Sequence, residues 1–128
     1  QSIAFAGAQS NYDVRLPAGN LIKGVHVYTE NATTGAAVNT ITAFKLGAGL
    51  DVRVALSGDQ NRYLQLARYA GLITGFYQHD FTAHAPGFGQ VGTLSNVWDV
   101  TGSVEPKLTV DVAVACQMTV RVEELIRL

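Results

Sequence analysis

Charged residues are scarce in this sequence. Only 15% of its 128 residues are Asp, Glu, Lys or Arg, whereas 48% are hydrophobic; an average soluble domain has about 25% charged residues. Much of the surface must therefore be uncharged. Such a surface suits a protein that packs against neighbouring subunits, so the composition favours self-association.

An excess of one charge is also missing. The net charge is −1, and the nine basic residues are scattered along the chain. Proteins that bind nucleic acids gather Lys and Arg into a stripe or patch. We therefore expect no direct contact with nucleic acid.

Cysteine and long apolar runs are almost absent. The single cysteine, Cys116, cannot form an internal disulfide and lies on the apolar side of an alternating pattern, which predicts a buried, inert thiol. No apolar run approaches the roughly 18 residues that a membrane span requires, and the N-terminus lacks the basic flank and apolar block of a signal peptide. We therefore expect neither a membrane span nor an export signal.

The end of the sequence shows a long alternation of apolar and other residues. Every second residue is apolar across Leu108, Val110, Val112, Val114, Cys116, Met118, Val120 and Val122. Successive side chains on a strand point to opposite faces, so the valines are predicted to be buried and Thr109, Asp111, Thr119 and Arg121 to be more exposed. Because strands usually have about 3 to 10 residues, the segment must bend at a bulge or pass from one sheet to another.

The rest of the chain also reads mainly as strands. Alternation between turn signals predicts strands near residues 12–16, 21–28, 40–46, 50–56, 75–83 and 96–100. Helical spacing appears only near residues 60–70, with Asp59 as a possible N-cap, Gly71 as a stop and Tyr63 packed over a sheet. Helices do not alternate with strands, so we predict an all-β antiparallel sandwich or barrel with one short helix. The length fits a single domain over residues 1–128, with residues 1–10 as a candidate extended arm.

Candidate catalytic and metal-binding residues are few. The segment "HDFTAH" contains His79, Asp80 and His84, but residues five apart on a strand face opposite sides, and His26 would have to join from a distant strand. Ser57 stands before Gly58 and a helix without the flanking glycines or the base of a nucleophile elbow. The glycines of "GAG" and "GFGQVG" lack the lysine and the helix of a phosphate loop. We therefore predict no catalytic residue, no metal site, no cofactor and no enzymatic activity.

Aromatic residues offer a different possibility. Trp98, Phe88, Tyr77 and Phe76 could line a sugar-binding surface, although aromatic residues near strand ends more often fill the core of a sandwich. A carbohydrate- or receptor-binding β-sandwich module is therefore the alternative function. A cupin-like metal enzyme is a weaker rival, because it needs at least three converging ligands.

Several segments resemble a known family when they are taken in order. They are "VRLPAG", "GVHVYTEN", "ITAFKLGAGLDVRVALSGDQNRYLQLARYAG", "GFYQHDF", "NVWDVTGS" and "KLTVDVAV". This order resembles the N-terminal barrel of the jelly-roll coat proteins of membrane-containing icosahedral bacteriophages, the corticovirus type within the double-jelly-roll lineage. The similarity covers about residues 11–115. It lies in the L-P-x-G strand, the D-x-R-V-x-L-x-G element at Asp51 to Gly58, and the helix that follows.

The resemblance implies a jelly-roll capsid subunit located in the virion. Such a subunit self-assembles, or co-assembles with other capsid subunits, into an icosahedral shell, with indirect proximity to a viral membrane and no cofactor. Coat proteins of that lineage usually carry two barrels, whereas this chain has room for one. It therefore resembles either a single-barrel capsid protein or one barrel of a larger protein. We expect association through the barrel flanks, with Thr109, Ala113, Ala115 and Thr119 as a small, uncharged contact face.

Overall fold

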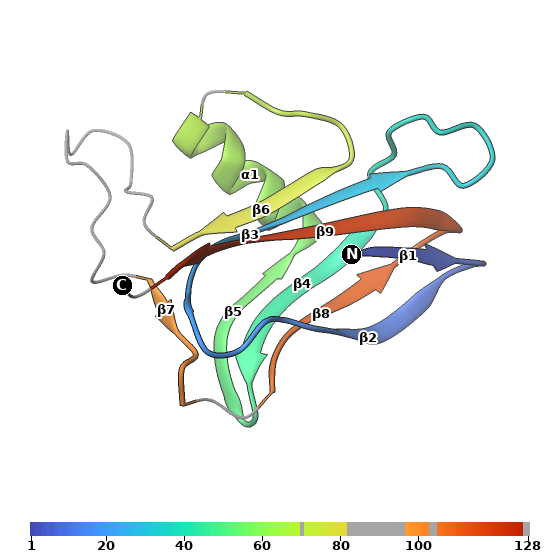
Figure 1. The fold of residues 1–128 in the computed structure, drawn as a ribbon. Helices are drawn as coiled ribbons and strands as arrows, with labels where there is room; N and C mark the ends of the chain where they lie inside the picture. The colour runs from blue at the N-terminus through green and yellow to red at the C-terminus, as the bar shows by residue number, and fades with distance from the viewer. Residues whose placement is uncertain (70, 82–96, 103–104, 127–128) are drawn as a thin grey trace.

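The chain folds into two antiparallel sheets that pack face to face (Figure 1). The computed structural model describes residues 1–69, 71–81, 97–102 and 105–126. Sheet A contains, in spatial order, β1 (Ser2–Phe5), β9 (Cys116–Leu125), β3 (Leu21–Glu30) and β6 (Phe76–Asp80), with β7 (Trp98–Asp99) also paired to β3. Sheet B contains β2 (Gln9–Arg15), β8 (Pro106–Val112), β4 (Ile41–Ala48) and β5 (Asp51–Ser57). The helix α1 (Gly58–Tyr69) joins β5 to the segment before β6.

The strand partners are nested along the sequence. Strand β4 pairs with β5, β3 with β6, β2 with β8, and β1 with β9, all antiparallel. This is the connectivity of one long hairpin that has been rolled up so that its strand pairs alternate between two sheets, which defines a jelly roll. The structure thus confirms the predicted all-β jelly-roll sandwich with a short helix near residues 60–70. None of the described helical residues forms a helix long and apolar enough to cross a membrane.

The C-terminal alternation belongs to two strands in different sheets. Strand β8 ends at Val112 in sheet B, and β9 begins at Cys116 in sheet A. The backbone N–H groups of Ala113 and Val114 donate hydrogen bonds to Thr40 Oγ1, at 3.2 and 3.1 Å, which fixes the crossing between the sheets. Of the two alternatives for this long segment, passage from one sheet to another is therefore correct.

Burial along this segment follows the prediction except at the crossing. Val110, Val112 and Val120 are buried, and Val122 is half-buried. The prediction was wrong for Val114, whose side chain is 49% exposed because it lies between the two strands. The single contact face that we predicted does not exist either, because Thr109 lies on sheet B and Thr119 on sheet A.

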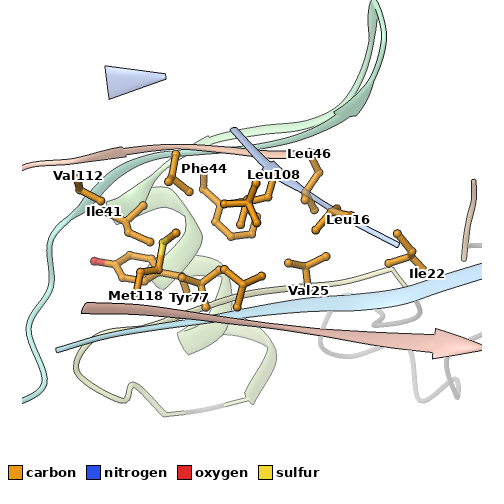
Figure 2. Packing of buried hydrophobic residues seen from close by; sticks show 14 of the residues in the cluster. Leu16, Ile22, Val25, Ile41, Phe44, Leu46, Tyr77, Leu108, Val112 and Met118 are labelled. Atoms are coloured by element: carbon orange, nitrogen blue, oxygen red, sulfur yellow. The ribbon is translucent and has the colours of Figure 1, made fainter. Parts of the chain in front are cut away.

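The core fills the space between the two sheets. Figure 2 shows Ile41, Phe44 and Leu46 of β4 facing Val25, Tyr77 and Met118 of sheet A. Tyr77 and Trp98 are buried in this core, as expected for aromatic residues of a sandwich. They therefore cannot belong to a sugar-binding surface. Of the other two members of that candidate platform, Phe76 is half-buried on β6, and Phe88 lies outside the described residues.

The thiol of Cys116 is fully buried in the core, and burial raises its pKa above the usual value. We therefore expect a thiol reagent to label the native protein at least roughly a hundredfold more slowly than the denatured protein, because labelling requires opening of the core. The measurement is a time course of mass increase with and without denaturant. Equal rates in the two states would show that the thiol is accessible or activated.

Helix α1 begins with a capping box rather than at the predicted N-cap. The Gln60 N–H donates to Ser57 Oγ at 3.1 Å, and the Ser57 N–H donates to Gln60 Oε1 at 2.9 Å. Ser57 is therefore the N-cap, and Asp59 lies in the first turn. This reciprocal pair assigns a structural role to Ser57, the residue that superficially resembled a nucleophile.

The buried face of α1 is polar. Asn61 and Gln65 are buried, whereas Tyr63 is 69% exposed, so the prediction that Tyr63 packs over a sheet was wrong. Asn61 Nδ2 donates to the Gln78 carbonyl at 2.9 Å, and the Gln78 N–H donates to Asn61 Oδ1 at 3.1 Å. Gln65 Nε2 donates both to Asn61 Oδ1 and to the Phe76 carbonyl. Two side-chain amides thus satisfy backbone groups at the free edge of β6, which otherwise could pair with a strand of another chain.

The remaining predicted strands differ mainly at their ends. Leu50 lies in the β4–β5 turn after Gly49, whose positive φ of 59° suits glycine. Leu50 and Val52 are exposed rather than part of a buried face. Of the strand predicted at 96–100, the described residues form β7 over Trp98–Asp99. Residues 1–10, the candidate arm, contain β1 and the start of β2.

Candidate functional site

The histidines and acidic residues singled out in the sequence do not converge. His79 and Asp80 lie on β6; the His79 ring contacts Phe81 edge to face at 4.6 Å between centroids, and Asp80 Oδ2 lies 3.5 Å from Lys23 Nζ. His26 lies on β3 and contacts Glu123 instead. His84 is outside the described residues. Among the residues that the structure does describe, no three His, Cys, Asp or Glu side chains gather as metal ligands.

A groove lies on the outer face of sheet A. We call it the sheet A groove; it has a volume of about 440 Å³ and is lined by His26, Val27, Tyr28, Phe76, Thr119, Arg121 and Glu123. The period of two along β3 places His26 and Tyr28 on the same face of the sheet. The register of the strands then sets Arg121 opposite His26, and sets both Thr119 and Phe76 opposite Tyr28. Three strands therefore contribute to one surface.

Aromatic rings form one side of the groove. The His26 and Phe76 rings stack with their centroids 5.9 Å apart and their planes at 23°. Tyr28, on the strand next to Phe76, is half-buried and lines the groove. The groove therefore combines apolar ring faces with the polar atoms of His26 and Tyr28. Ligand sites commonly have this composition: an apolar lining contacts the ligand, and a few polar groups fix its orientation.

The carboxylate of Glu123 is already paired. Lys23 Nζ lies 3.0 Å from Glu123 Oε2, and His26 Nε2 lies 3.1 Å from Glu123 Oε1. The hydrogen bond from Lys23 lowers the pKa of Glu123, and the same bond raises the pKa of Lys23, with Asp80 adding to the effect. This end of the groove is therefore an ion network in which Lys23 lies between the carboxylates of Glu123 and Asp80.

Arg121 is different from its charged neighbours. Its side chain is exposed on β9 beside His26, and within the described part of the chain it has no hydrogen-bond or ion-pair partner. A guanidinium offers five N–H donors in a planar fork that matches a carboxylate. The groove thus combines aromatic faces with a cation that remains available.

Sequence reasoning found only parts of this groove. It singled out Phe76 as an aromatic residue and His26 as a possible metal ligand, but it assigned no role to Tyr28 or Arg121 in a site. The alternation of His26 and Tyr28 on β3 was a usable signal for one strand. The contribution of β9 depends on strand register, which local sequence does not define.

A second surface gathers apolar side chains around α1. Tyr63 and Leu66, three residues apart on the helix, are both exposed, and Tyr63 lines a hollow with Leu56 and Leu64. We call Leu56, Tyr63, Leu64 and Leu66 the α1 flank. Leu72 and Ile73, in the segment after the helix, are also exposed. Figure 1 shows that α1 lies at one side of the sandwich, beside β6.

The fold and these surfaces define a jelly-roll β-sandwich with an outer-face groove and an apolar flank. No protein-family profile matches the sequence, and no curated protein matches it. Among solved structures, the chain is similar to the major capsid protein P2 from Bacteriophage PM2, with a TM-score of 0.65 and 10% sequence identity. The similarity covers 98% of this chain and 50% of that chain, so this chain spans about half the length of the capsid protein that it matches. At this level of identity, the likeness shows that the two proteins share a fold.

Proposed function

We propose that this chain is a structural virion protein: a jelly-roll capsid subunit that self-assembles or co-assembles into an icosahedral shell. The observation that carries the proposal is the likeness of 98% of the chain to half of a phage major capsid protein. A fold by itself supports many functions, so the scarcity of charge and the exposed apolar flank are needed as further support. In this role the protein works by assembly, without turnover, cofactor or direct nucleic-acid contact.

The proposal also concerns domain organisation and location. We infer that residues 1–128 form one jelly-roll domain and that this domain stands as one barrel of the shell, in the virion and indirectly close to a viral membrane. The matched capsid protein is about twice as long as the matched region. A neighbouring barrel would therefore come from a second copy of the chain, from another subunit or from a further part of a longer protein.

The α1 flank is the surface that best fits such a neighbour. Tyr and Leu side chains that are exposed in a monomer gain free energy when another subunit covers them, at about 25 cal/mol per Å² of apolar area. The exposed side chains of Tyr63 and Leu66 lie on one face of α1, while Asn61 and Gln65 fix the helix to β6 from the other side. The helix is therefore held rigidly enough to present a defined contact surface. A modest contact repeated around a shell holds many copies together.

The test is light scattering over a concentration series. The unmodified protein is expected to form dimers, trimers or larger assemblies as its concentration rises, or to form them with a partner subunit. A Tyr63→Ser, Leu66→Ser variant is expected to shift this association to about tenfold higher concentration or beyond, equivalent to about 1.4 kcal/mol.

The matched control is Leu50→Ser. Leu50 is fully exposed in the β4–β5 turn, at the opposite end of β5 from the start of α1. This variant removes an exposed apolar side chain away from the α1 flank and is expected to associate like the unmodified protein. A protein that stays monomeric at millimolar concentration and contacts no sister subunit would overturn the capsid proposal.

A further inference from the structure

The sheet A groove suggests a ligand that neither the fold nor the assembly proposal requires. We propose that it binds an acidic saccharide, with a sugar ring against the aromatic side formed by Phe76 and Tyr28, and with the sugar carboxylate paired to Arg121. The inference goes beyond the proposed function and rests on the groove alone. It assigns the groove to one chemical class, a pyranose ring that carries a carboxylate.

The aromatic side provides the surface for the ring. Phe76 and Tyr28 are directly opposite each other in the β3–β6 register, where Cβ atoms lie about 4.5–5.5 Å apart. Stacking of His26 on Phe76 fixes the Phe76 ring from one side. The C–H face of a pyranose is apolar and flat, so it packs on such rings. A small inorganic anion has no surface that could use them.

The arrangement of charged groups favours a ligand that carries a carboxylate. Lys23 already pairs with the carboxylates of Glu123 and Asp80, and His26 contacts Glu123, whereas Arg121 has no such partner among the described residues. An anion that enters the groove therefore meets an available guanidinium, which can donate two parallel hydrogen bonds to a carboxylate. Thr119, on the same strand as Arg121, adds a hydroxyl that can exchange hydrogen bonds with sugar hydroxyls.

A matched pair of sugars tests the proposal: methyl glucuronide and methyl glucoside, which differ only at C6, where the first has a carboxylate and the second a hydroxymethyl group. Each is titrated into ¹⁵N-labelled protein while amide chemical shifts are recorded. Methyl glucuronide is expected to shift the amides of His26, Tyr28, Phe76, Thr119 and Arg121 with at least about tenfold higher affinity than methyl glucoside.

Variants assign this preference to particular side chains. Arg121→Gln is expected to make the two sugars bind equally weakly, because it removes the charge from an exposed position without disturbing the core. Phe76→Leu keeps an apolar side chain but removes the ring, and is expected to weaken both sugars. Arg53→Gln is the control: Arg53 is an exposed arginine on β5 in sheet B, and its loss is expected to leave binding unchanged.

Three results would overturn the inference. They are the absence of groove shifts with methyl glucuronide, an unchanged preference in Arg121→Gln, and binding of inorganic phosphate to the same amides as tightly as methyl glucuronide. The last result would make the groove a simple anion site. None of these results affects the assembly proposal, because Arg121 and Phe76 lie in sheet A, outside the α1 flank through which association is measured.

Discussion

Replacing Val112 with Asp is expected to abolish soluble folding of this chain. Val112 is 3% exposed and lies between the two sheets at the end of β8 (Figure 2). A buried carboxylate without a partner costs several kcal/mol, which is comparable with the whole stability of a domain, about 5–15 kcal/mol. The expected observations are loss of soluble protein after expression and, in any soluble fraction, loss of the near-UV circular dichroism and of a cooperative melting transition.

Val114→Asp is the matched control for this substitution. Val114 has the same side chain and the same place in the sequence alternation, but it is 49% exposed in the crossing between the sheets. Its replacement is expected to change the free energy of unfolding by only about 0.5 kcal/mol. Normal melting of Val112→Asp, or equal damage from both substitutions, would contradict the burial that the structure assigns.

Replacing Asn61 with Leu is expected to lower the free energy of unfolding by roughly 2–4 kcal/mol, because each buried polar group that loses its partner costs about 1–3 kcal/mol. The backbone N–H and carbonyl of Gln78 lose their hydrogen bonds to Asn61, and the Gln65 amide loses one of its acceptors. The larger hydrophobicity of Leu does not compensate for these losses at a polar sheet edge. Urea unfolding monitored by circular dichroism measures the change.

Gln60→Leu provides the comparison for Asn61→Leu. Gln60 is the preceding residue and is exposed, and among the described residues its side chain hydrogen-bonds to the Ser57 backbone in the capping box. Its loss is expected to cost about 1 kcal/mol or less. If the two variants were equally stable, the contacts of α1 with β6 would contribute no more than a helix cap, and the proposed role of Asn61 would be wrong.

The fold class could be predicted from the sequence, but the position at which the long C-terminal alternation is interrupted could not. Alternation continues from Val112 through Val114 to Cys116 although these residues belong to two sheets and a crossing. The crossing contains three residues, an odd number, so the strand that follows resumes with the same alternation. Ala113 and Ala115 are small and carry no turn signal, so nothing local marks the break.

The helix was predicted with the wrong face buried because its environment is unusual. Helical periodicity assumes that the apolar side chains face the core, but α1 faces a sheet edge with backbone groups that need partners. Asn61 and Gln65, spaced by four residues, are suited to that edge, and they leave Tyr63 and Leu66 outside. The sheet A groove was not predictable for a related reason: it depends on the register of β3, β6 and β9, which tertiary contacts determine.

The nested strand pairs also differ in the entropic cost of forming them, because they enclose loops of different length. Strands β4 and β5 are joined by a two-residue turn, so their pairing closes almost no loop, whereas Phe5 of β1 pairs with Cys116 of β9 across nearly the whole described sequence. The cost of loop closure increases with the number of residues enclosed, and proteins dominated by distant pairings fold slowly. Each inner pair that forms shortens the loop that the next pair must close. The folding order with the lowest entropic cost therefore begins with the β4–β5 hairpin and continues with the outer pairs. On this route, the pairing of β9 with β3 and β1 forms last. A neighbouring subunit that binds before this step would contact a sheet A in which the edge of β3 is still unpaired.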